Sequence, residues 1–252
     1  MTTAAKPTAT TTLPDPSGSY LTLIYPQTPT SQNNFMSLIG YCVPLTISLS
    51  GNMCTITVTD NGTDTVPYNQ GNHPNSGNLQ FALNLSQAYC RFNIDVLNRP
   101  GESLILQGTV QFTINSLTTT CDVRLLKPPI SMPGGSYSVT AVNTLLNGTL
   151  TLAMDPSTNQ PTGTYLLKGE TNPTTIDPAP LWNTAGTPYQ AMLTFTAMNY
   201  NFRAMYDPKW HPTGERMDHK FRGTAGSSFA GDDSDWTAQA TVSEPEPTPT
   251  KP

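Results

Sequence analysis

Apolar and polar residues alternate with a period of two along most of this chain. The longest such run joins Leu104, Leu106, Gly108, Val110, Phe112 and Ile114. Shorter runs occupy residues 79–85, 90–96, 150–154, 191–197 and 236–242. A period of two with one polar face is typical of half-buried antiparallel strands. No helical period extends beyond about two turns, so the pattern predicts an all-β fold.

The connections between these runs agree with that prediction. Ser50, Gly51 and Asn52 form a tight hairpin signal, and residues 155–161 form a longer turn. Residues 60–78 are polar and predict a long loop. About ten to twelve strands at this spacing predict an antiparallel β-sandwich or jelly roll, with a closed β-barrel as the alternative.

The two ends of the chain differ from the body. Residues 1–18 and 243–252 are rich in Pro and Thr and predict extended arms, which could dock on a neighbouring subunit. Residues 19–242 are expected to form a single β domain. Within it, residues 189–242 hold only two clear strands and are expected either to form an extension packed on the main body, carrying the polar loop 203–235, or to supply strands that complete it.

Charge is scarce and concentrated. Residues 1–202 hold 15 of the 29 charged residues, whereas residues 203–235 hold 11, with two of the three histidines. The body therefore relies on Thr hydroxyls and on amides for its polar face. The segment 203–235 is the first place to look for chemistry or for contact with a partner.

Composition also limits the partners. The net charge is −5 and no Lys/Arg-rich stretch occurs, which argues against nucleic acid and anionic membrane surfaces. No apolar run reaches the roughly 20 residues that span a bilayer, so membrane insertion is not expected. Residues 1–19 lack the apolar core of a signal peptide. Location stays open between the cell interior, export through another signal, and export within a particle.

Four cysteines are present: Cys42, Cys54, Cys90 and Cys121. None has a metal-ligand spacing. Cys54, Cys90 and Cys121 are in phase with apolar neighbours, which favours small buried side chains over one or two disulfides between strands.

Two groups could bind a metal. His211, Glu215, Asp218 and His219 supply ligands suited to Zn²⁺, but Pro212 and Gly214 place them in a loop. Asp232, Asp233 and Asp235 supply carboxylates suited to Ca²⁺, without the Glu that closes an EF-hand. A solvated loop and a polar turn explain these residues better than a Zn²⁺ or Ca²⁺ site does, so no cofactor is expected.

Aromatic residues interleave with the charged segment. The candidate contact residues for a sugar or a protein partner are Tyr200, Tyr206, Trp210, His211 and Phe221. Packing of an irregular loop onto the body explains these aromatic residues as well, and is the favoured interpretation.

The sequence contains no nucleophile elbow and no phosphate-binding Gly loop, and only five Glu occur, two of them in the terminal tail. The first expectation is therefore a non-catalytic structural or attachment protein that self-associates or joins other subunits of a virion, phage tail or surface fibre. The alternative is a carbohydrate- or ligand-binding module. A second alternative is a metal-dependent hydrolase centred on His211, Glu215 and His219.

Overall fold

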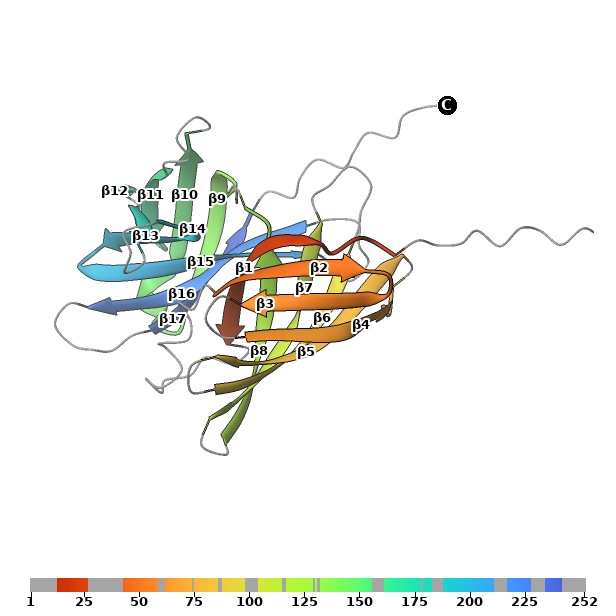
Figure 1. The fold of residues 1–252 in the computed structure, drawn as a ribbon. Coiled ribbons are helices and arrows are strands. Elements are labelled where there is room, and N and C mark those ends of the chain that lie inside the picture. Colours follow the sequence, from red (N-terminus) through yellow and green to blue (C-terminus); the bar gives the residue numbers. More distant parts are fainter. Residues whose placement is uncertain are drawn as a thin grey trace, which may run out of the picture. The chain divides into compact units, whose positions relative to one another are not determined.

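The computed structural model describes residues 13–26, 43–58, 62–73, 75–85, 88–97, 104–114, 117–128, 130, 132–155, 161–177, 179–182, 188–210, 217–227 and 234–241. The chain divides into two compact units. The first holds residues 1–22 and 43–127, and the second holds residues 23–42 and 128–252. Each unit is built around a barrel of antiparallel strands (Figure 1).

The first barrel is a closed meander in which each strand pairs with the next along the chain (Figure 1). Its strands are β1 (Gly18–Pro26), β2 (Val43–Ser50), β3 (Met53–Val58), β4 (Gly62–Gln70), β5 (Ser76–Leu85), β6 (Ala88–Leu97), β7 (Ile105–Ile114) and β8 (Leu117–Leu126). The apolar residues of the alternating pattern point inward and fill the barrel.

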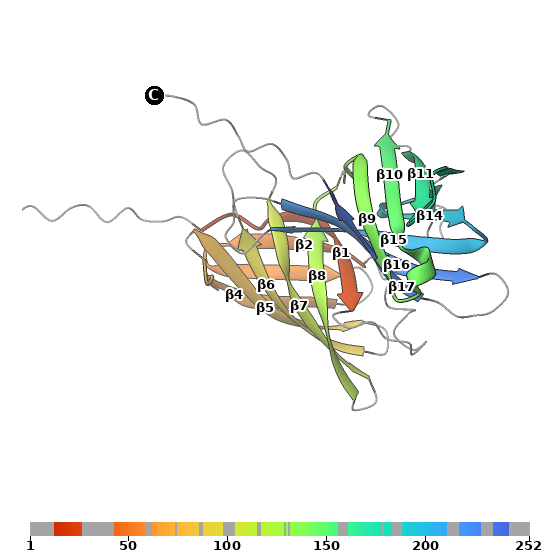
Figure 2. The same cartoon turned by 180° about the vertical axis from the view of Figure 1, so that it is seen from behind.

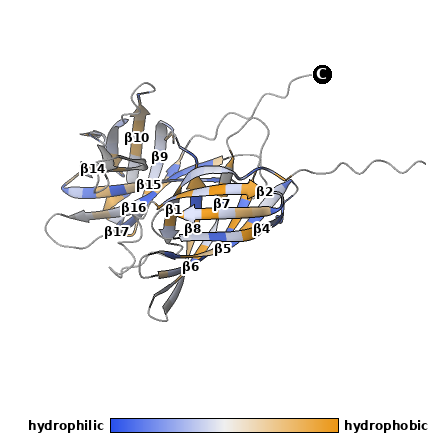
Figure 3. Cartoon of the chain, viewed as in Figure 1, coloured by the Kyte–Doolittle hydropathy of each residue, from blue (hydrophilic) through white to orange (hydrophobic). Residues whose placement is uncertain are grey.

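The burial pattern of β6 shows this alternation directly. Cys90, Phe92 and Ile94 are buried, whereas Tyr89, Arg91 and Asn93 face solvent. Figure 3 shows the resulting mixture of hydrophobic and hydrophilic positions along the strands. Burial of the apolar set stabilises the barrel by roughly 25 cal/mol per Å², and full closure removes exposed strand edges.

The second barrel is nearly closed and is seen from behind in Figure 2. Its sheet runs in the order β12-β11-β10-β9-β17-β16-β15-β14-β13. The strands are β9 (Gly135–Ala141), β10 (Gly148–Met154), β11 (Pro161–Leu167), β12 (Thr174–Ile176), β13 (Ala179–Trp182), β14 (Pro188–Ala197), β15 (Tyr200–Trp210), β16 (Met217–Ser227) and β17 (Ser234–Ala240). A short 3-10 helix, η1 (Thr144–Leu146), joins β9 to β10.

Aromatic rings fill the second barrel. Phe195 and Phe202 stack at 4.6 Å between centroids, and Trp236 meets both rings edge-on at 6.1 and 5.6 Å. Tyr165 adds a tilted contact with Phe202 at 5.4 Å. Such edge-on and offset arrangements suit the charge distribution of aromatic rings.

The all-β prediction is confirmed, but the sandwich or jelly roll of ten to twelve strands is wrong. Two antiparallel barrels take its place, one closed with eight strands and one nearly closed with eight strands and the short β13. The alternative of a closed barrel therefore describes the first of them. The sandwich was inferred from strand spacing, which does not record that β17 returns to pair with β9. Residues 189–242 contribute strands to the second barrel. Residues 60–78, predicted as a long loop, contain β4.

The predicted arms fall almost wholly on residues outside the described ranges, 1–12 and 243–252. Cys54, Cys90 and Cys121 are buried, as expected for small apolar side chains. Cys42 lies outside the described residues. Across the described part of the chain, no helix has the length and hydropathy needed to cross a membrane.

Candidate functional site

The charge-rich segment forms most of the β15–β16 hairpin. Asp207 lies opposite Lys220 in the register, and Tyr206 lies opposite Phe221. Because side chains alternate across a strand, the two pairs face opposite sides of the sheet. Tyr206 and Phe221 are buried with the other rings of the second barrel.

The inner side carries an aromatic–imidazole cluster. The hydroxyl of Tyr206 and Nδ1 of His219 lie 2.6 Å apart, and their rings are nearly parallel at 6.0 Å. The amide of Gln239 donates to the carbonyl oxygen of His219 at 3.4 Å. Phe221 contacts both Tyr206 and Tyr137. The hydrogen bond fixes the orientation of a half-buried imidazole against a buried phenol.

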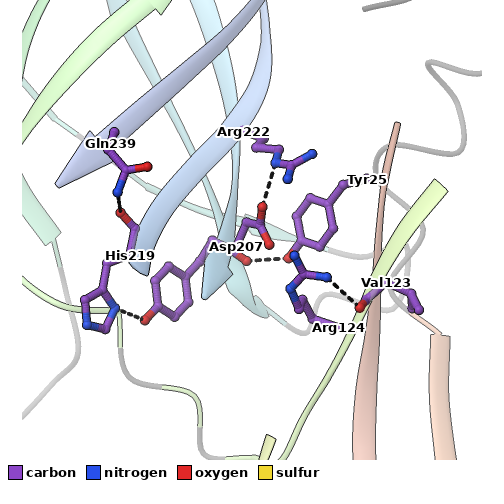
Figure 4. A network of polar contacts seen from close by, with 8 residues as sticks. Tyr25, Val123, Arg124, Asp207, His219, Arg222 and Gln239 are labelled. Carbon is purple, nitrogen blue, oxygen red and sulfur yellow. Dashed lines mark hydrogen bonds and ion pairs between the residues drawn. The ribbon is translucent and has the colours of Figure 1, made fainter. Parts of the chain in front are cut away.

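The outer side carries a buried ion pair, shown in Figure 4. Oδ2 of Asp207 lies 2.6 Å from Nε of Arg222, and the Asp207 side chain is fully buried. The guanidinium lies over the ring of Tyr25 at 5.4 Å, and the Tyr25 hydroxyl donates to the carbonyl oxygen of Tyr206 at 2.5 Å. This arrangement ties residues near the end of β1 to the β15–β16 hairpin.

The predicted metal ligands do not converge among the described residues. No group of three or more His, Cys, Asp or Glu side chains lies close enough there to hold a metal. Asp218 lies opposite Lys209, Asp235 lies opposite Thr224, and His219 bonds to Tyr206. The other candidates, His211, Glu215, Asp232 and Asp233, lie outside the described ranges.

The predicted aromatic contact residues are also spread out. Tyr206 and Phe221 pack together, but Tyr200 begins β15, six residues earlier, with its hydroxyl near the amide of Asn143 at 3.5 Å. Trp210 ends β15 opposite Met217, and its side chain is outside the described part. His211 lies outside it as well.

A groove on the first barrel was missed by sequence reasoning. It has a volume of about 510 Å³ and lies over β4, β5, β6 and β7. Its lining comprises Asp64, Gln80, Phe81, Ala82, Arg91, Phe92, Asn93, Thr109 and Gln111. These residues alternate with core positions, so the sequence shows only that most of them face outward and gives no motif.

The groove follows from a short ladder between β4 and β5. The two strands pair at Tyr68↔Leu79, Asn69↔Asn78 and Gln70↔Gly77. Farther along, Oδ2 of Asp64 accepts a hydrogen bond from the backbone N–H of Ala82 at 3.0 Å. A carboxylate therefore satisfies a strand donor that would otherwise lack its ladder partner.

The floor and rim of the groove have different character. The rings of Phe81 and Phe92 stack at 4.6 Å below it. At its edge the Arg91 guanidinium lies 5.6 Å from the ring centroid of Tyr89, which is 41% exposed. The hydrogen bond with Tyr89 raises the pKa of Arg91.

The amides beside the groove are held in a network. Nδ2 of Asn78 donates to Oδ1 of Asn93 at 2.9 Å and to Oδ1 of Asp95 at 3.0 Å. Nε2 of Gln80 donates to Oδ1 of Asn78 at 3.3 Å. The groove thus presents oriented donors and acceptors, one carboxylate and one cation on a strand scaffold.

No protein-family model matches this chain, and no curated protein matches it. Among solved structures, similarity is found to kievitone hydratase from Nectria haematococca, with 12% identity, 89% of each chain covered and a TM-score of 0.28. A DUF3598-family protein of unknown function from Nostoc punctiforme is 9% identical over 91% of this chain and 95% of that chain, with a TM-score of 0.24. TM-scores this low do not establish a shared fold, so function is argued from the geometry.

Proposed function

We propose that this chain is a non-catalytic carbohydrate-binding protein whose first barrel takes the sugar in the groove over β4 to β7. The observation that carries the proposal is the lining of that groove. One carboxylate, one guanidinium, three side-chain amides and one hydroxyl surround it: Asp64, Arg91, Gln80, Asn93, Gln111 and Thr109.

A sugar matches this lining chemically. Its hydroxyls both donate and accept hydrogen bonds, as do amides, whereas carboxylates accept and guanidinium groups donate. Tyr89 adds an exposed aromatic ring beside the polar groups, and such amphipathic rings suit partners with an apolar face and polar edges. The volume of about 510 Å³ falls within the size range of small-ligand sites.

The same lining favours binding over hydrolysis. Glycosidases of the common kind place two carboxyl groups on either side of the bond that breaks. Asp64 is the single carboxylate among the residues that line this groove, and it already accepts the Ala82 N–H. The groove lining therefore supplies recognition groups without the acid and base pair.

The test begins with a glycan array and continues with calorimetry on free maltotriose, chitotriose and sialyllactose. Arg91→Ala and Gln111→Ala should each raise the Kd for the sugar about tenfold. This is the effect expected from losing a hydrogen bond that contributes about 1.4 kcal/mol. Lys168→Ala, an exposed charge in the second unit, is the matched control. A silent array, or unchanged affinity in both groove variants, would overturn the proposal, and released monosaccharide would show hydrolysis instead.

The subunit role expected from composition stays a separate prediction. Attachment to glycans and assembly into a particle are compatible in one protein. Light scattering and negative-stain microscopy measure assembly directly, and a strict monomer at every concentration would count against it.

A further inference from the structure

The second barrel has a groove of its own. It has a volume of about 470 Å³ and lies where β12 meets β14 and β15. Its lining comprises Thr175, Ile176, Asp177, Thr194, Phe195, Thr196, Asn201, Phe202 and Arg203. As in the first barrel, a stacked pair of Phe rings lies beneath polar side chains on the outer wall.

The two grooves occupy equivalent places in their barrels. Each barrel is a meander whose last strand closes on its first, and each groove extends from the fourth strand or its end over the fifth and sixth strands. In the first barrel the fourth and fifth strands are β4 and β5, which pair over a short ladder. The second sheet ends at β12 and at the short β13, which pairs with β14. With β13 left out of the count, its fourth and fifth strands are β12 and β14, its sixth is β15 and its seventh is β16.

The strand register supports the equivalence residue by residue. Phe81 lies opposite Phe92 across the fifth and sixth strands of the first barrel, and Phe195 lies opposite Phe202 in the second. The rings stack at 4.6 Å in both pairs, with interplanar angles of 10° and 8°.

The seventh strands repeat a glycine at the same register. Gly108 lies opposite Ile94, two residues after Phe92, and Gly223 lies opposite Ala204, two residues after Phe202. A Cβ at Gly108 would collide with the carbonyl oxygen of Asn93, and one at Gly223 with that of Arg203. Both barrels therefore bring the seventh strand close to the residue that follows the second Phe.

This register aligns the polar side chains of the grooves. Arg91 and Asn93 flank Phe92 of β6, and Asn201 and Arg203 flank Phe202 of β15, in reversed order. A carboxylate enters each groove from the fourth strand or its end, Asp64 in one and Asp177 in the other. Thr194 and Thr196 replace Gln80 and Ala82.

We infer that the second groove is a second binding site for the same class of ligand, so that one chain holds two sugar sites. This inference rests on the function proposed above. The two lining sets share one carboxylate, one guanidinium and one asparagine amide around a stacked Phe pair, which is the recognition chemistry assigned to the first groove.

The test is an NMR titration of the ¹⁵N-labelled full chain with maltotriose, chitotriose and sialyllactose. Two groups of amides should shift, one around residues 80–93 and one around residues 194–203. Arg91→Ala should raise the Kd at the first groove at least tenfold and change the second less than twofold, and Arg203→Ala should do the reverse. Lys168→Ala should change neither, and the spectra themselves report whether each variant is folded.

The outcomes separate the two proposals. Shifts confined to residues around the first groove would overturn the second site and leave the proposed function standing. Shifts confined to residues around the second groove would overturn the proposal that sugar binds in the first groove, and with it the proposal of two sites. No shift with any of the three sugars would overturn both.

Discussion

Asp207 is the residue whose surroundings depart furthest from those of an ordinary charged side chain. It is fully buried in a chain that holds few charges, and it is paired with an Arg222 side chain that is 20% exposed. A buried ion pair gains little net stability because both charges lose water. Removing one partner is costly, however, because the other charge is left without compensation.

We therefore expect Asp207→Ala to lower the free energy of unfolding by about 2–4 kcal/mol, measured by urea denaturation followed by circular dichroism. Glu170→Ala, at an exposed turn, should change it by less than about 0.5 kcal/mol. The double variant Asp207→Leu with Arg222→Met should regain most of the loss. If Asp207→Ala has the same free energy of unfolding as the unchanged protein, the ion pair does not contribute to stability.

The buried thiols give the protein a sensitivity to alkaline pH. Burial, with a smaller contribution from Asp15 at Cys54 and Asp122 at Cys121, raises the pKa of each thiol to about 11. An unfolded thiol ionises near pH 8.5. Between these two pH values the folded state holds more protons than the unfolded state. The thiols therefore make their full contribution to the free energy of unfolding below pH 8.5, and this contribution is lost as the pH rises toward 11.

Urea midpoints at several pH values between 8 and 11 measure this decline. The urea midpoint of the variant carrying Cys54→Ala and Cys121→Ala should decline less steeply with pH. Some decline should remain, because burial raises the pKa of Tyr20 to about 12. Iodoacetamide should modify Cys54 and Cys121 at pH 8 only after urea is added. Rapid modification without urea would contradict the burial argument.

Most of the strands could be predicted from the sequence, but their closure into two barrels could not. The alternation in residues 79–85 and 90–96 identified β5 and β6 because each strand buries one face. β4 was missed because only Val66 and Tyr68 along it are buried, so its pattern looks like a polar loop. Closure depends on pairing between strands far apart in the chain, which local periodicity does not encode.

The candidate site was predictable only in part, for a related reason. Tyr206 and Phe221 stand out as aromatic residues in a charged segment and do pack together. The pairing of Tyr206 with His219 requires the β15–β16 register, which the sequence does not reveal. Both grooves were missed because Arg91, Asn93 and Arg203 look like ordinary outward-facing strand residues.

The two glycines of the seventh strands make a further prediction at this scale. An alanine is normally better than glycine inside a strand, by up to about 1 kcal/mol. At Gly108 and Gly223 the collision with a backbone carbonyl outweighs that gain, because backbone atoms cannot turn aside. We expect Gly108→Ala and Gly223→Ala each to cost about 2–3 kcal/mol.

Gly169→Ala is the matched control for these variants. Gly169 has a φ of +94° but open space around its Cβ direction, so its substitution should cost about 1 kcal/mol from backbone strain alone. Urea denaturation compares the three. An equal loss of unfolding free energy at all three positions would show that the close approach of the seventh strand does not affect stability.

In the whole molecule, the scarcity of charge has a structural counterpart on the strand surfaces. Threonine hydroxyls pair across neighbouring strands at Thr55 and Thr65, at Thr57 and Thr63, and at Thr113 and Thr118, at 3.2, 3.3 and 3.2 Å. Neutral cross-strand pairs of this kind stabilise a sheet without ions. The polar face of the body thus depends on hydroxyls and amides, as the composition indicated.

The division into two units has a spectroscopic consequence. Trp182, Trp210 and Trp236 are the three tryptophans of the chain, and all belong to the second unit. Tryptophan fluorescence, excited selectively over tyrosine, therefore observes only the second unit, whereas far-ultraviolet circular dichroism observes the strands of both. The difference between the two signals isolates the first barrel, so each half of the molecule can be followed without an added label.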